Sequence, residues 1–339
     1  MFRYVGSLIG VVLALVCLGG ANARAAAVPE GPRLALIKWD FFEERYVLVT
    51  VDRTGAQPLR LAGGGERTRP LPDIFEAPVW SPDGSSIVFS GVAHRLEGGP
   101  RAYRLYIVGA DGHGLRPLLG TRGATSPAFA PDGHSIAFAR PWRRGASIWL
   151  ADLAGGPPRR VTPKRRGHYM FPGSFSPDGG TLLATRYSGR QEEVVALHLA
   201  TGEIETVLRH ADFPVYSPDG TTLAFLHWRA KRRRDGTRTY FSDLFTIGVD
   251  GSGLRRLTHT PDQNELFPSW NPSGERIAFV RYLPEPVESL FVAIGLGASV
   301  MQMNPDGTCP KEILEPSIEA IYGTAWQPGP GREAGRIPC

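Results

Sequence analysis

The feature that most constrains this chain is a short phrase that it repeats along its length. Proline suits the second position of a type I turn, and Asp-Gly suits the last two, so each copy predicts a strand that ends in a tight turn. The aspartates Asp83, Asp132, Asp178 and Asp219 are therefore expected to serve turn geometry rather than catalysis. The copies are VWSPDG (Val79 to Gly84), AFAPDG (Ala128 to Gly133), SFSPDG (Ser174 to Gly179), VYSPDG (Val215 to Gly220), SWNPSG (Ser269 to Gly274) and a worn AWQPGPG from Ala325.

Three more strands are expected after each of the regular copies. The second strand reads SIVFS, SIAFA, TLLAT, TLAFL or RIAFV; the third resembles LYIVGAD or SIWLADL, and the last resembles PRRVT or LRRLT. The 41 glycines and 30 prolines suit a chain made largely of strands and turns. A four-strand unit that recurs every 40 to 55 residues, roughly, is typical of a β-propeller blade.

Counting these units predicts an all-β fold, a six-bladed β-propeller with four-stranded antiparallel blades. The first blade has three N-terminal strands, Arg33 to Asp40, Tyr46 to Asp52 and Pro58 to Ala62, with no repeated phrase before them. We expect Thr324 to Trp326 to supply the missing strand, so that one C-terminal strand closes the ring and removes its free edges. Five tryptophans in strand positions are expected to pack between blades: Trp39, Trp80, Trp149, Trp270 and Trp326.

The first residues have the pattern of a secretory signal. Arg3 precedes an apolar run from Val5 to Gly20, and the small residues Ala21 to Ala27 then offer Ala-x-Ala cleavage sites. The run is shorter than the roughly 20 residues that a spanning helix needs. We therefore expect a signal peptide over residues 1–27, a propeller over 28–329 and a tail over 330–339. The mature chain would be periplasmic or secreted, with no integral membrane span; an uncleaved anchor is the alternative.

The net charge of the chain limits which partners it can bind, and its cysteines depend on the redox state of its compartment. Cleavage would lower the formal net charge from +5 to +3, because Arg3 and Arg24 would be lost. So small a charge gives no indication of nucleic-acid binding. Cys309 and Cys339 would remain. Both are expected on the same face of a propeller, and in an oxidising compartment they could pair; two free thiols are the alternative.

The repeated phrase, followed by an Ile-Ala-Phe strand and preceded by Leu-Thr at the end of the previous unit, resembles the TolB-like six-bladed propellers. The resemblance covers nearly all of the mature chain. It implies a propeller that meets an envelope protein or a lipoprotein over its mouth. TolB itself carries a small α/β domain ahead of its propeller, whereas here only a few residues separate the predicted signal from the first strand.

The long, dissimilar loops lie opposite the repeated turns, and function usually resides on such loops. Their basic residues predict an arc over blades three to five, facing acidic residues such as Glu265 across the mouth. We predict a non-catalytic interaction module, acting as a monomer without a cofactor, that binds an envelope protein through this arc; an acidic glycan is an alternative ligand. The predicted binding residues are Arg140, Trp142, Arg143, Arg144, Lys164, Arg165, Arg166, His168, Arg186, Arg190, Trp228, Lys231, Arg232, Arg233 and Arg234.

Histidines on the same loops offer an alternative function. Imidazoles that converge on a propeller mouth could bind a divalent metal, and some lyases built on related propellers are understood to use such a site. The alternative is therefore a metal-dependent polysaccharide lyase or hydrolase. The residues come from separate segments without paired ligand spacing; the candidate ligands are His168, His210, His227 and His259, with His94 also on this face. Other motifs of hydrolases and of phosphate or dinucleotide binding are absent from the sequence.

Overall fold

The computed structural model describes residues 32–40, 45–62, 78–92, 103–189, 191–232, 238–282, 298–317, 321–329 and 336–339. These residues form strands and turns and no helix. Consequently, no helix in the described ranges could serve as a membrane span. The predicted signal peptide, residues 1–27, lies outside the described residues.

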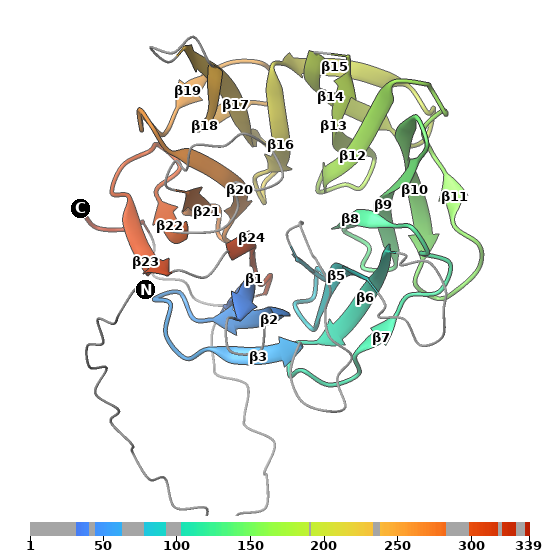
Figure 1. Cartoon of the computed structure of the whole chain (residues 1–339), viewed down its shortest axis with the longest axis horizontal. Coiled ribbons are helices and arrows are strands. Elements are labelled where there is room, and N and C mark those ends of the chain that lie inside the picture. The colour runs from blue at the N-terminus through green and yellow to red at the C-terminus, as the bar shows by residue number, and fades with distance from the viewer. Residues whose placement is uncertain are drawn as a thin grey trace, which may run out of the picture.

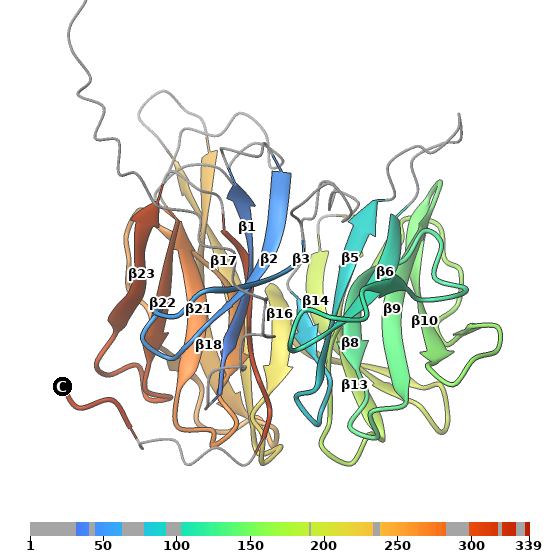
Figure 2. The same ribbon diagram turned by 90° about the horizontal axis from the view of Figure 1, so that it is seen from below.

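Four sheets contain four strands each, and with a fifth, larger sheet they surround a common centre (Figure 1). The strands run between two faces of the molecule (Figure 2). The first sheet has the order β24 (Ile321–Trp326), β1 (Leu34–Asp40), β2 (Arg45–Val51), β3 (Leu59–Ala62). The second is β4 (Val79–Trp80), β5 (Ser86–Val92), β6 (Tyr103–Gly109), β7 (Arg116–Pro117). Another is β16 (Ala211–Tyr216), β17 (Thr222–Arg232), β18 (Arg238–Gly248), β19 (Arg255–Arg256). The last four-stranded sheet is β20 (Asn264–Trp270), β21 (Ile277–Tyr282), β22 (Ala298–Met303), β23 (Lys311–Ser317).

The remaining sheet has eight strands, so the strand pairing does not give six separate four-stranded sheets as the sequence predicted. The join is a single parallel bridge between Ala146 and Tyr169. It forms because β11 is only two residues long and pairs with Trp149 and Leu150, which leaves the rest of the β10 edge uncovered. Its strands are β8 (Thr125–Phe129), β9 (Ser135–Trp142), β10 (Gly145–Asp152), β11 (Arg159–Arg160), β12 (His168–Phe175), β13 (Thr181–Ser188), β14 (Gln191–His198) and β15 (Ile204–Arg209).

The repeated turns are built by side-chain hydrogen bonds, as the sequence predicted. In the first, the Ser81 hydroxyl donates to Asp83 Oδ1 at 2.6 Å, and the amide of Ser85 donates to the same oxygen at 3.0 Å. Ser217 and Asp219 repeat the first contact at 2.6 Å. These hydrogen bonds, led by the serine hydroxyl, lower the pKa of Asp83 and Asp219. The aspartates therefore hold the turns.

A β-bulge interrupts the first strand of several units. In β16, Phe213 and Pro214 lie opposite the single residue Phe225, and in β20 Phe267 and Pro268 lie opposite Phe279. A bulge is one of the few places in a sheet that tolerates proline, which lacks an N–H for the ladder. Phe213 and Phe267 have positive φ angles of 49° and 56°, and their rings make an edge contact at 5.3 Å. The bulges thus turn two aromatic rings toward each other.

Buried apolar side chains fill the spaces between neighbouring sheets. One cluster joins Leu34 and Val49 of the first sheet to Ala278 and Val300 of the last. Another lies within the eight-stranded sheet. It joins Ile148 and Leu150 on β10 to strands that follow β12, so the two halves of that sheet face each other across a core. Trp80 and Trp326 are buried between sheets as expected.

The C-terminal segment is tied to the start of the chain. β24 pairs with β1 between Ala325 and Ala35, among others. The indole N–H of Trp80 donates to the carbonyl of Ala325 at 2.9 Å, and the Gln327 amide donates to the carbonyl of Gly84 at 2.8 Å. Strands from both ends of the chain therefore share one sheet, which in turn contacts the second sheet.

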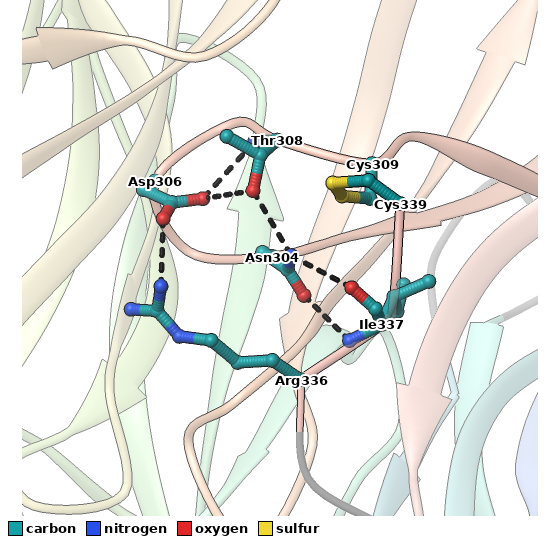
Figure 3. The surroundings of a disulfide bond; sticks show 7 residues. All are labelled: Asn304, Asp306, Thr308, Cys309, Arg336, Ile337 and Cys339. Atoms are coloured by element: carbon teal, nitrogen blue, oxygen red, sulfur yellow. Dashed lines mark hydrogen bonds and ion pairs between the residues drawn. A yellow bond between two sulfur atoms is a disulfide. The ribbon is translucent and has the colours of Figure 1, made fainter.

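Residues 336–339 dock on the turn between β22 and β23 (Figure 3). Cys309 and Cys339 form a disulfide. The Asn304 side chain accepts a hydrogen bond from the Ile337 amide at 2.8 Å and donates to the Ile337 carbonyl at 3.2 Å, while Arg336 pairs with Asp306 at 2.8 Å. Ile337 is buried. The tail is therefore held by covalent, polar and apolar contacts together.

Candidate functional site

Two basic segments lie side by side on the loop-rich face. Arg143 and Arg144 form the turn between β9 and β10, and Lys164 to Arg166 lie in the link between β11 and β12. The amide of Gly167 donates to the carbonyl of Arg144 at 2.8 Å, and the Ala146–Tyr169 bridge follows directly. We call Arg143, Arg144, Lys164, Arg165 and Arg166 the basic double loop. Because main-chain bonds join its two segments, their backbones have a defined spacing.

Trp142 packs next to this double loop. Its side chain is partly buried and lies against Gly145, where an added Cβ would stand 2.8 Å from the indole ring. The ammonium of Lys164 lies 5.9 Å from the centre of the same ring. Trp142, which the sequence predicted as a binding residue, thus packs against Gly145 and lies close to Lys164.

The five cations of the basic double loop are exposed. Within the described part of the chain, none of them forms an ion pair with a carboxylate. Burial, followed by the charges of Arg165 and Arg186, lowers the pKa of the neighbouring His168. The surface therefore carries a positive potential without a described internal counter-charge.

Arg140 and Arg186, predicted as part of the arc, are engaged in the fold. The Arg140 guanidinium lies 4.4 Å from the Trp149 ring and donates to the carbonyl of Gly120 at 2.6 Å. Arg186 donates to Glu193 at 2.5 and 3.0 Å, and the Glu193 side chain is only 6% exposed. Both guanidinium groups thus make contacts within the fold.

Three further members of the predicted arc, Trp228, Lys231 and Arg232, lie in β17, in a different sheet from the double loop. Lys231 pairs with Asp262 at 2.6 Å, and both side chains are more than half exposed. Trp228 is partly buried, and its indole is one of the donors that lower the pKa of Asp212. Arg232 ends β17. Arg190, Arg233 and Arg234 lie outside the described residues.

A buried carboxylate that the sequence analysis missed lies between β13 and β16. Asp212 accepts hydrogen bonds from the Thr185 hydroxyl at 2.7 Å, from the Phe213 amide at 2.7 Å and from Tyr187. Burial raises the pKa of Asp212, and these hydrogen bonds act in the opposite direction. The only hint in the sequence was an Asp just before Phe-Pro.

Of the four candidate metal ligands, only His210 and His227 have a described contact with each other. His168 begins β12, His210 precedes β16, His227 lies in β17, and His259 is in the link after β19. The imidazole N–H of His227 donates to the main-chain carbonyl of His210 at 2.6 Å. No group of three or more metal-ligating side chains occurs in the described ranges. His94 lies outside them.

Comparison with known proteins places this fold. The sequence model of the TolB beta propeller domain matches residues 29–234. An uncharacterized protein of Agrobacterium fabrum is 29% identical over 217 residues, covering 62% of this chain and 67% of that protein. The Tol-Pal system protein TolB of Anaeromyxobacter dehalogenans is 32% identical over 133 residues, covering 38% of this chain and only 28% of the relative.

Two solved structures agree with the fold. The crystal structure of TolB from Acinetobacter baumannii has a TM-score of 0.67 at 20% identity, covering 88% of this chain and 67% of that one. A putative TolB from Agrobacterium tumefaciens has a TM-score of 0.59 at 20% identity, covering 89% of this chain and all of that one. With the match to more than half of the sequence, the chain belongs to the TolB beta propeller domain family.

Proposed function

We propose that this protein is a non-catalytic interaction module of the cell envelope, which binds an acidic surface of a partner protein through the basic double loop. The observation that carries the proposal is the set of five exposed cations on two hydrogen-bonded segments, with no described carboxylate paired to them. Membership of the TolB beta propeller domain family and the likeness to a Tol-Pal system protein support an envelope role in the periplasm.

We further propose that the eight-stranded sheet is a pair of blades, so that the propeller has six and spans residues 28–329. The core between β9–β10 and β13–β14 supports this division. Closure of the ring is supported by the cluster between the first and last sheets and by the contacts of Gln327 with Gly84. Residues 1–27 would be the signal that directs the chain to this compartment.

Such a surface would act mainly on the rate and the orientation of association. Exposed charges contribute little energy one by one, but a cluster of one sign steers an oppositely charged partner. The fixed backbone spacing of the double loop means that its two segments need not be ordered on binding, although their side chains must be. Binding should therefore weaken as salt rises, because exposed charges are screened over about 8 Å at physiological ionic strength.

The test is affinity recovery from envelope extract with the wild-type protein and a variant in which Arg143, Arg144, Arg165 and Arg166 are all changed to Glu. The matched control carries the same charge change on exposed arginines elsewhere: Arg53, Arg116, Arg159 and Arg160. The proposal expects one protein to be recovered by wild type and control but not by the double-loop variant. It also expects the purified partner to rebind in a salt-sensitive way. Equal recovery by all three forms, or no protein recovered by any, would overturn it.

A further inference from the structure

The β17–β18 hairpin extends beyond the rest of its sheet. Each of its strands has 11 residues, whereas β9, β10, β13 and β14 have 8. β17 pairs with β18 as far as Arg232 and Arg238. Its pairing with β16, on the other side, ends at His227. Residues Trp228 to Arg232 therefore lie beyond the last residue of β17 that β16 covers.

The strand register shows which main-chain groups this leaves open. The amides of Ser242 and Leu244 donate to the side chains of Asn264 and Thr258, both at 2.9 Å, so they face away from β17. In an antiparallel pair, opposite residues face each other or turn away together, and the two cases alternate. Trp228, opposite Ser242, therefore faces away from β18, as do Ala230 and Arg232.

His210 explains why the ladder with β16 stops. Its φ is positive, at 56°. Its amide donates to the carbonyl of Glu192 at 2.7 Å, and its carbonyl accepts from the His227 ring. His210 is thus turned out of the strand, and in the described part of the chain no strand lies opposite Trp228 to Arg232. Ala230 is correspondingly exposed.

We propose that this edge, Trp228 to Arg232, accepts an extended acidic segment of a partner protein as an added β-strand. An open edge with alternating N–H and C=O groups is the surface that strand addition uses. The acidic preference follows from Lys231, whose exposed side chain pairs with Asp262, and from two further arginines in the sequence, Arg232 and Arg238, which stand opposite each other at the last register position of the hairpin. The edge lies on a different sheet from the basic double loop, so the two proposals are independent.

Ala230→Pro tests the edge selectively. Proline removes an N–H that faces away from β18, and an edge strand tolerates it there. Ala230→Thr is the matched control, because it keeps the N–H. The probe is a labelled peptide about seven residues long that alternates Glu with Val, so that its charged residues share one face. Versions with Lys in place of Glu, or with N-methyl groups on alternate amides, separate charge from strand pairing.

The acidic peptide should bind wild type and Ala230→Thr alike and slow hydrogen exchange at the Ala230 amide. Ala230→Pro and peptide N-methylation should each weaken binding about tenfold, the loss expected for a main-chain hydrogen bond and its steric block. The Lys peptide should not bind. The proposal is overturned if no peptide binds. That result would mean that the basic residues prevent strand addition at this edge. The proposal is also overturned if the N-methylated peptide binds as well as its parent, and that measurement does not depend on folding of the proline variant.

Discussion

Gly84 and Pro328 meet so closely that any side chain at position 84 would force the main chain to shift. A Cβ there would overlap the carbonyl oxygen of Pro328. Gly84 belongs to the first repeated turn, whereas Pro328 follows the last strand, β24. We therefore expect Gly84→Ala to lower the free energy of unfolding by about 3 kcal/mol, combining a left-handed backbone penalty with a steric clash. Urea unfolding measures this change.

Gly133→Ala is the control for that variant. Gly133 occupies the same turn position, with a φ of 69° against 68° for Gly84, but the nearest atom to its added Cβ would be 3.9 Å away. It should cost only the backbone penalty, about 1 kcal/mol. Equal losses for both variants would mean that the contact with Pro328 adds nothing, and would count against closure of the ring.

These turns also show what a single sequence can predict. Pro-Asp-Gly predicts the geometry of its turn, because each residue type suits one position of the turn. The hydrogen bonds of Asp83 also come from residues only two positions away in the sequence. Contacts of this range can be inferred without a fold. The Ala146–Tyr169 bridge could not, because it depends on how much of β10 a two-residue neighbour leaves uncovered.

Arg186 provides a test of structural against binding roles. Removing it would leave the Glu193 carboxylate, which is nearly buried, with Arg209 as its remaining ionic partner. Loss of one partner of a buried pair is strongly destabilising. We expect Arg186→Ala to lower the free energy of unfolding by about 2 to 3 kcal/mol, and Arg166→Ala, an exposed control, to change it by less than about 0.5 kcal/mol. Chemical denaturation of the two variants side by side would refute this if both were equally stable.

The same residue shows where sequence reasoning failed at the site. Arg186 and Arg166 are equally basic in the sequence, and both fall at the loop-rich face. Glu193 lies opposite Arg186 on the next strand, but facing positions are known only once the register is known. The five cations of the double loop are exposed, whereas Arg186, from the same predicted arc, is held by Glu193.

The disulfide should contribute measurably to stability. Cys309 and Cys339 are 30 residues apart, and the cross-link encloses β23 and β24. The chain-entropy estimate for a loop of this length is roughly 3.5 kcal/mol. We expect the double variant Cys309→Ala, Cys339→Ala to lose stability of this order. Wild type in reductant is the comparison, and a thiol count under denaturing, non-reducing conditions that finds free cysteines would contradict the pairing.

Two aspartates should respond to pH with opposite signs. Burial raises the folded-state pKa of Asp212, so folding favours the protonated carboxyl. As pH rises above the ordinary pKa of an aspartate, this carboxyl therefore lowers the stability of the folded protein. The Ser217 hydroxyl and the Thr221 amide lower the pKa of Asp219. Asp219 therefore contributes stability that is present above its ordinary pKa and is lost as pH falls through the lowered value.

Replacement by Asn exposes each effect, because it keeps the shape and removes the titration. The stability of Asp212→Asn relative to wild type should improve as pH rises from about 4 to 8, starting from a loss of about 1 kcal/mol for an altered hydrogen bond to Tyr187. Asp219→Asn should instead be worst at neutral pH and approach wild type in acid. Urea midpoints across the pH series decide the matter. A flat difference for Asp212→Asn would show that this carboxyl titrates normally despite its burial.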